Sequence, residues 1–201
     1  IWHDGAVYEV RLLGDGLHAL YRLDTRVFRD HDAGPLPEGG RDAGPGAAAG
    51  ASASPTIDVV VAYTADVAAV YAAPVAFAQA AVDASNTASD NSAVQPRLRL
   101  VHAYETPTAS SGSTATDLTR LQGTSDGFFD EVHALRDQYG GDLVALLGPS
   151  SGTYSSCGRG YINASAAFAF TITAYNCAVG NLTFAHELGH NMGLRHNPEV
   201  D

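Results

Sequence analysis

Three histidines and one glutamate stand at fixed spacing near the end of the chain, in the segment HELGHNMGLRH at residues 186–196. His186 and His190 are four residues apart, so on a helix they lie on one face, one turn from each other. Two ring nitrogens placed in this way can bind the same metal ion. Glu187 follows His186 and reaches the same region without occupying a ligand position, which is typical of a metal site with a base beside it.

Gly193 explains how a third histidine can reach the same ion. On a straight helix His196 would lie about 2.8 turns beyond His186 and would not return to the site. Glycine adopts the left-handed conformation without a Cβ penalty, so Gly193 can end the helix and turn the chain back. We therefore expect His196 to be the third ligand.

This set of residues suits one kind of chemistry. Three neutral imidazoles favour one Zn²⁺ and leave a fourth position for water. Zinc lowers the pKa of that water toward ~7 and polarises a carbonyl group. Glu187 can take the proton of the water and pass it to a leaving amine, so the segment predicts metal-assisted amide hydrolysis with Glu187 as general base.

The elements that must position this segment alternate between strands and helices. Hydrophobic runs and alternation predict strands at 57–64, 97–104, 142–148, 160–164 and 167–175. Helical periodicity predicts helices at 66–89 and 124–139 and a last helix that begins near Asn181, a good N-cap residue. This order indicates an α/β (α+β) fold with a mixed sheet.

The N-terminal part has a different composition. AVYEVRLL and LHALYRLD, joined by the turn GDG at residues 14–16, predict a hairpin within residues 1–32. Gly, Pro and Ala dominate residues 33–56, which we expect to be a linker with a processing site. The chain starts at Ile1 rather than Met, so we expect that preceding residues are missing.

Composition excludes several function classes. The chain of 201 residues has a net charge of −11 and no run of basic residues, which argues against nucleic acid as a partner. No apolar stretch approaches the ~20 residues of a membrane span. Cys157 and Cys177 predict one disulfide in a secreted protein and two buried thiols in a cytosolic one.

A resemblance to a known family rests on the segment FAHELGHNMGLRHN, the preceding CGRGYINA and the Cys157/Cys177 pair. With these features the chain resembles the bacterial reprolysin-like zinc proteases, which include the peptidyl-Asp metalloendopeptidases. H-E-x-x-H-x-x-G-x-x-H is the metzincin signature. The resemblance covers most of residues 56–201 and implies a metzincin-like upper subdomain. It also implies a mostly parallel twisted sheet with an antiparallel edge strand, packed by helices that include the zinc-binding one.

The same resemblance implies a secreted, extracellular bacterial zymogen, and we expect it to be a monomer. Residues 1–32 would be the end of its propeptide and residues 57–201 its catalytic domain. Metzincins carry a methionine turn after the third histidine, whereas Met192 is the only methionine here. We therefore expect the chain to end before that turn.

The resemblance also implies a substrate site. A protein or peptide would bind in extended form along the edge strand, at Arg159, Gly160, Tyr161 and Ile162. Arg159 is then a candidate for a preference for acidic residues, with Arg195 as the other candidate by position. The alternative, which the sequence favours, is that Arg159 is a solvated surface arginine. The alternative function is a non-catalytic zinc-binding or protein-binding module that retains the site.

Overall fold

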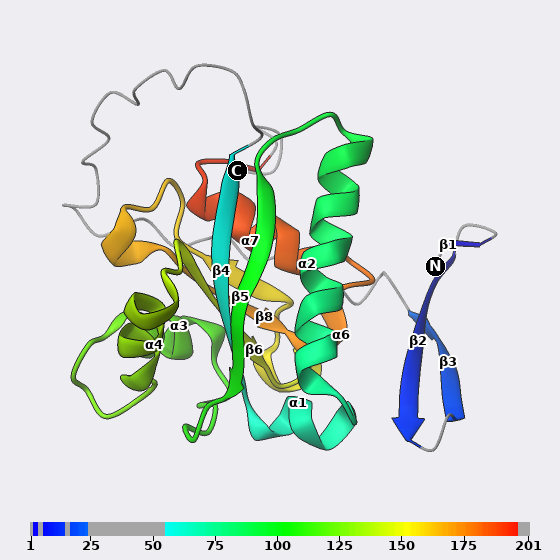
Figure 1. Cartoon of the computed structure of the whole chain (residues 1–201). Coiled ribbons are helices and arrows are strands. Elements are labelled where there is room, and N and C mark those ends of the chain that lie inside the picture. Colours follow the sequence, from blue (N-terminus) through cyan, green and yellow to red (C-terminus); the bar gives the residue numbers. More distant parts are fainter. Residues whose placement is uncertain (1, 4–5, 15–16, 24–54, 197–201) are drawn as a thin grey trace.

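A five-stranded sheet with helices on both faces forms the body of the molecule in the computed structural model, which describes residues 2–3, 6–14, 17–23 and 55–196 (Figure 1). The strand order is β5-β4-β6-β8-β7. The strands are β4 (Thr56–Tyr63), β5 (Arg97–Glu105), β6 (Leu143–Gly148), β7 (Gly158–Gly160) and β8 (Phe170–Ala174). Only β7 runs antiparallel to its neighbour, so the predicted mixed, mostly parallel sheet with an antiparallel edge strand is confirmed.

The central strands are apolar because both of their faces are covered. Every residue of β6 is buried. Along β4, Val59 and Val61 pack into one hydrophobic core, and the alternate residues Val60 and Ala62 pack into a second core on the opposite face. A continuous hydrophobic run is the pattern expected of such a strand.

Helices line each face of the sheet. One face carries α1 (Ala65–Val70), α2 (Pro74–Asn91), α6 (Tyr175–Ala178) and α7 (Thr183–Asn191). The opposite face carries α3 (Thr114–Gln122), α4 (Glu131–Tyr139) and the short α5 (Ser151–Tyr154). Figure 1 shows α2 and the pair α3 and α4 on the two sides of strands β4 and β5.

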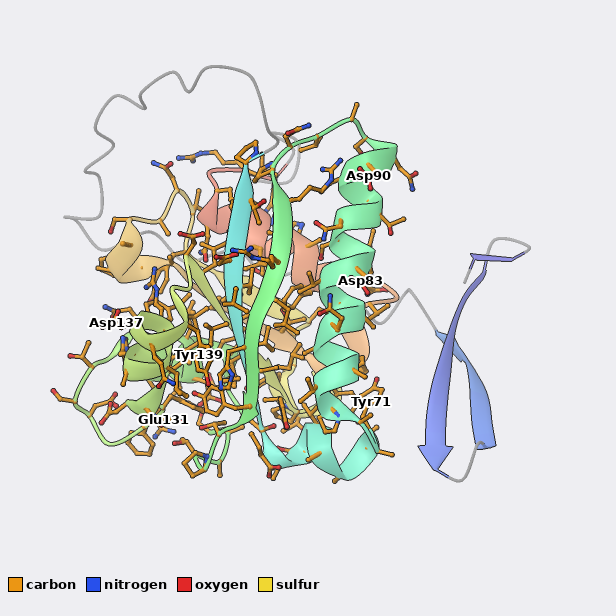
Figure 2. All side chains as sticks on the ribbon, viewed as in Figure 1. Tyr71, Asp83, Asp90, Glu131, Asp137 and Tyr139 are labelled. Carbon is orange, nitrogen blue, oxygen red and sulfur yellow. A yellow bond between two sulfur atoms is a disulfide. The ribbon has the colours of Figure 1, made fainter. Side chains whose placement is uncertain are left out.

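The helix predicted at 66–89 is divided in two. Helix α1 ends at Val70, and α2 begins at Pro74, the first helical residue. Proline has no backbone N–H and disfavours helical conformation in the residue before it, so it suits a helix start and not a helix interior. Tyr71 lies in the break, at the base of α2 (Figure 2), where its ring stacks on Phe77 with 3.8 Å between centroids.

The helix predicted at 124–139 begins later than expected, at Glu131. The carboxylate of Asp130 accepts hydrogen bonds from the backbone N–H groups of Asp126 and Gly127 at 3.2 and 2.9 Å, which stabilises a loop instead. Phe129 has a positive φ of 57° and is buried, whereas Phe128, which helical spacing from Val132 would place on the buried face, is exposed. The predicted end of this helix at residue 139 is confirmed, and Gly140 after it has a left-handed conformation with φ of 66°.

Other elements depart from the sequence prediction in smaller ways. Helices α3 and α5 were not predicted. The strand predicted at 167–175 is β8 from Phe170, and Phe168 belongs to a short 3₁₀ helix, η2 (Ala166–Phe168), instead of the predicted strand face. Phe170, Ile172 and Ala174 do pack into one core, as their alternation predicts.

The predicted N-terminal hairpin is confirmed. A separate three-stranded antiparallel sheet consists of β1 (Trp2–His3), β2 (Ala6–Gly14) and β3 (Leu17–Leu23). Most of the predicted linker, residues 33–54, lies outside the described residues. Its last residue, Thr56, already pairs with Arg97 at the start of β4.

Candidate metal centre

The three histidines of the motif converge at the C-terminal end of α7. One ring nitrogen from each of His186, His190 and His196 lies within 4.8 Å of the other two. The Nε2 atoms of His186 and His196 are 3.1 Å apart. Two ligands of one tetrahedral ion with Zn–N bonds of ~2.0–2.1 Å lie roughly 3.3 Å apart. The cluster therefore has the spacing of a metal site.

Gly193 makes this convergence possible. Its φ is 96°, and its N–H donates to the carbonyl oxygen of His190 at 2.9 Å. The next N–H, that of Leu194, donates back to the carbonyl oxygen of Gly189 at 2.9 Å, which ends the helix and reverses the chain. A Cβ at Gly193 would also lie 3.3 Å from Oδ1 of Asn163. Glycine thus fits both the conformation and the space, and the turn returns His196 to the helix.

The tautomer of His190 suits a metal ligand. Its Nδ1 lies 2.9 Å from the carbonyl oxygen of Leu194, an atom that only accepts hydrogen bonds. Nδ1 is therefore the donor in this hydrogen bond, which leaves Nε2 as the ring atom that can bind a metal. Carbonyl partners of this kind fix the orientation of metal-ligating histidines. The sequence motif does not reveal that Leu194 orients His190. The contact is made by the backbone oxygen of Leu194, which the turn at Gly193 places next to the ring.

Glu187 lies beside the histidines but deep in the protein. Its side chain is 1% exposed and contacts β7, where it lies against the backbone of Gly158 and Gly160. The structure thus places a buried carboxylate between α7 and β7, at the position that follows His186 on the same helix. A buried carboxylate next to a metal-binding group is suited to proton transfer.

The predicted substrate-binding segment is divided between a strand and a loop. β7 ends at Gly160, so the strand predicted at 160–164 is wrong beyond its first residue. The following backbone leaves β8 and bonds to the end of α7 instead. The N–H of Asn163 donates to the carbonyl oxygen of His190 at 2.7 Å, and Nδ2 of Asn191 donates to the carbonyl oxygen of Tyr161 at 2.8 Å. Sequence reasoning missed the role of Asn191, although its place directly after His190 is a usable signal.

Arg159 and Gly160 face opposite sides of the sheet. Arg159 pairs with Ile172, whose side chain belongs to the core under α3 and α4, so the half-buried Arg159 lies on that side. Tyr161 packs against the same core, and burial raises the pKa of its hydroxyl, which stays protonated at neutral pH. Gly160 instead faces α7 and Glu187. Ile162 is half-buried in the loop.

A disulfide fixes the start of the edge strand. Cys157 and Cys177 are joined with an S–S distance of 2.07 Å, and both are buried. The bond connects the residue before β7 to α6, the short helix that precedes α7. Asn181 is not the N-cap of α7. That position belongs to Leu182, whose φ is 58°, and the amide Nδ2 of Asn181 instead lies 3.9 Å from Sγ of Cys157.

Comparison with known proteins agrees with this geometry. Residues 75–197 match the model of the family described as "Metallo-peptidase family M12B Reprolysin-like". A relative named "Peptidyl-Asp metalloendopeptidase" from Xanthomonas campestris pv. campestris is 33% identical over 210 residues, with 100% of this chain and 49% of the relative covered. A protein of the same name from Stenotrophomonas maltophilia (strain K279a) is 35% identical, with 98% of this chain and 48% of that protein covered.

Two further findings complete the comparison. A protein of the same name from Pseudomonas aeruginosa is 36% identical over 172 residues, which cover 77% of this chain and 28% of that protein. The present chain thus spans about half the length, or less, of these curated relatives. A chain in a solved "Structure of a chaperone-substrate complex" superposes with a TM-score of 0.58 at 23% identity, over 74% of this chain and 25% of that one. This last likeness concerns the fold alone.

Proposed function

Because the chain belongs to the reprolysin-like metallopeptidases of family M12B, we propose that it is the zinc-binding part of a secreted endopeptidase. The observation that carries the proposal is the convergence of His186, His190 and His196 within 4.8 Å. Three imidazole nitrogens form the donor set of catalytic zinc sites that keep one position open. The Nδ1 hydrogen bond of His190 supports this assignment, because it leaves Nε2 for the metal.

Each residue has a distinct role in this proposal. The three histidines hold the ion, and the carbonyl oxygen of Leu194 orients the ring of His190. Bound zinc supplies Lewis acidity and lowers the pKa of water. Glu187 accepts a proton from the attacking water and later donates it to the leaving amine of the peptide. Burial of Glu187 against β7 restricts the positions that this carboxylate can take.

We propose that the substrate binds in extended form along β7. This strand has β8 as its one neighbour among the strands of the described sheet. Pairing through the main chain would place an extended peptide beside α7, with Arg159, Gly160, Tyr161 and Ile162 as the contacting residues. The relatives named peptidyl-Asp metalloendopeptidases suggest acidic residues as the preferred cleavage position.

Arg159 and Arg195 are the two candidates for recognising an acidic side chain. Arg159 is half-buried on the α3 side of the sheet, whereas Arg195 is exposed and directly precedes His196. Arg159→Ala and Arg195→Ala in the full-length enzyme separate them, measured as the ratio of kcat/KM for Asp-containing and Asn-containing peptides. If both variants keep the ratio of the wild type, neither arginine sets the preference.

The remaining assignments concern the whole protein. The buried disulfide is typical of an oxidising compartment, which supports secretion from a bacterial cell. The described helices include none that is both long enough and apolar enough to cross a membrane. We assign residues 1–32 to the end of a propeptide, 33–56 to a processed linker and 57–201 to the catalytic domain of a monomeric zymogen. The propeptide is then its first binding partner.

Casein digestion by the full-length protein tests the activity. A chelator should abolish cleavage, and added zinc should restore it. Glu187→Gln should lower kcat by roughly 10²–10⁴-fold with zinc still bound, because the base is lost and the ligands remain. Glu105→Gln, at an exposed glutamate of β5, is the matched control and should keep full activity. Cleavage that resists chelation, or full activity of Glu187→Gln, contradicts the proposal. Zinc binding without any cleavage by the wild type favours the non-catalytic module.

A further inference from the structure

Two glycines of β7 leave the space that the side chain of Glu187 occupies. A Cβ at Gly158 would lie 2.5 Å from Oε1, 2.7 Å from Cγ and 2.9 Å from Cδ of Glu187. A Cβ at Gly160 would lie 2.8 Å from the backbone oxygen of Glu187 and 3.3 Å from Oε2. A Cβ atom essentially never lies within 3.0 Å of such a neighbour. Any larger residue at position 158 or 160 must therefore displace Glu187 or the strand.

The two glycines contact different parts of Glu187. In the antiparallel register Gly158 pairs with Thr173 and Gly160 with Thr171, so both glycines face the same side of the sheet, toward α7. The atoms closest to Gly158 all belong to the side chain of Glu187, whereas the atom closest to Gly160 is its backbone oxygen. The missing side chain at Gly158 therefore leaves room for the Glu187 carboxylate, and the missing side chain at Gly160 lets the backbone of α7 approach the strand.

The strand cannot easily move away to relieve a clash. The loop after β7 is bonded to the end of α7 by backbone hydrogen bonds from Asn163 to His190 and from Ala164 to Asn191, at 2.7 and 3.0 Å. On the other side, the Cys157–Cys177 disulfide holds the residue before β7. With both ends of the strand tied, a methyl group at position 158 acts mainly on the side chain of Glu187.

We infer that Gly158 and Gly160 are positioning residues that set the location of the Glu187 carboxylate, an inference that rests on the function proposed above. The strand that we expect to bind the substrate and the group that we expect to transfer the proton are then in direct contact. Because residues 158 and 160 have no side chains, β7 and the Glu187 carboxylate can lie in contact. Gly158 acts through Glu187 alone, whereas Gly160 has this role in addition to its proposed contact with the substrate.

Kinetics of Gly158→Ala in the full-length protein test this inference. A carboxylate displaced by about 1 Å should lower kcat roughly 10–100-fold. KM should change little, and one zinc per chain should remain, because the histidines are unaltered. Gly152→Ala is the matched control, since a Cβ there meets only Oγ of Ser150 at 3.6 Å. It should match the wild type in all three quantities. An unchanged kcat in Gly158→Ala would overturn the inference.

A stability cycle gives a second result that does not depend on activity. Gly158→Ala should lower the Tm of the wild type by roughly 3–10 °C, as overpacking does in a domain of this size. In a Glu187→Ala background the space is vacant, so the same substitution should cost little, and it should restore folding if the single variant does not fold. An equal loss of Tm in both backgrounds would show that position 158 does not act through Glu187.

The two proposals fail in different ways. A wild-type protein that binds no zinc or cleaves no peptide contradicts the proposed function, whatever the stability cycle shows. An active, zinc-loaded wild type combined with additive stability losses contradicts only the role of the glycines.

Discussion

Two groups of polar side chains lie on opposite faces of the sheet, and they differ in how their polar atoms are satisfied. The histidine cluster, His186, His190 and His196, lies at the end of α7. The Asp117 cluster lies on α3, where the fully buried carboxylate of Asp117 accepts hydrogen bonds from Ser110 Oγ at 2.7 Å and Tyr154 hydroxyl at 3.0 Å. The backbone N–H of Ser111 adds a third donor, at 3.0 and 3.1 Å from the two carboxylate oxygens.

The difference is in how acceptors and donors are matched. Around Asp117 an acceptor meets donors from the protein itself, and burial raises the pKa of Tyr154, so its hydroxyl remains a donor. In the histidine cluster, one ring nitrogen from each of the three histidines lies within 4.8 Å of the other two. A cation between them can bind all three nitrogens at once. A buried polar cluster that the protein completes is structural, whereas one that a cation completes is a binding site.

The largest expected effect follows from His190→Ala. Loss of a ligand should lower zinc affinity by more than about 100-fold, because loss of a mere supporting contact costs 10–100-fold. Proteolytic activity should disappear with the metal. Competition with a chromogenic chelator measures the affinity. His102→Ala is the control. His102 on β5 stacks on Tyr139 on α4, outside the histidine cluster, so the substitution should leave zinc affinity unchanged. Wild-type affinity in His190→Ala would remove the contrast between the two clusters.

Asp117→Ala should have the reverse pattern, with stability lost and zinc affinity kept. The substitution would remove the buried carboxylate that accepts hydrogen bonds from Ser110, Ser111 and Tyr154. It would also remove the ion-pair partner of Arg120, whose guanidinium lies 3.8 Å from Asp117. The free energy of unfolding should fall by roughly 3–5 kcal/mol. Urea denaturation measures it, with Asp137→Ala on the exposed side of α4 as the control (Figure 2). A large loss of zinc affinity in folded Asp117→Ala would show that the two clusters are coupled.

Removal of the disulfide should affect stability more than metal binding. The Cys157→Ser/Cys177→Ser variant opens a loop with a sequence separation of 20 residues. Such loops contribute about 3 kcal/mol. We expect a lower Tm and intact zinc affinity, because the histidines are on α7 and its turn. Calorimetry under reducing and non-reducing conditions checks this, and a Tm that does not respond to reduction would contradict it.

The smallest effect concerns an exposed ion pair that belongs to neither cluster. Asp58 accepts two hydrogen bonds from Arg99, both at 2.7 Å, and this partner lowers the pKa of the Asp58 carboxyl. A lowered folded-state pKa stabilises the protein above the unfolded-state value of about 3.9 and ceases to do so as pH falls through the folded-state value. Asp58→Asn should therefore lower the Tm slightly at pH 7 and not at pH 2. An equal difference at both pH values would contradict this sign.

How much the sequence could predict depends on the range of the interactions. Most of the strands, the α7 histidines and the Gly193 turn follow from local pattern and spacing, whereas the edge strand β7 lies at Gly158–Gly160 instead of the predicted 160–164. Helix α3 was missed because its buried face includes Asp117 and Thr114, polar residues whose partners are distant in sequence. Pro74 is the local signal that divides the helix predicted at 66–89, because proline lacks a backbone N–H.

Parts of the candidate site also lie beyond sequence reasoning. The carbonyl oxygen of Leu194 bonds His190 only because the chain turns at Gly193. The burial of Glu187 against Gly158 depends on two elements that meet in space, and no spacing in the chain reveals it. Asn191 is adjacent to the motif, yet its bond to Tyr161 depends on the path of the loop after β7.

X-ray absorption spectroscopy of the zinc-loaded, full-length protein tests the central claim most directly. We predict one zinc per chain whose first shell contains three imidazole nitrogens at ~2.0–2.1 Å and one oxygen, with no sulfur. His196→Ala should reduce the imidazole count to two. A first shell that contains fewer than three imidazoles in the wild type, or one that does not change in His196→Ala, would contradict the account.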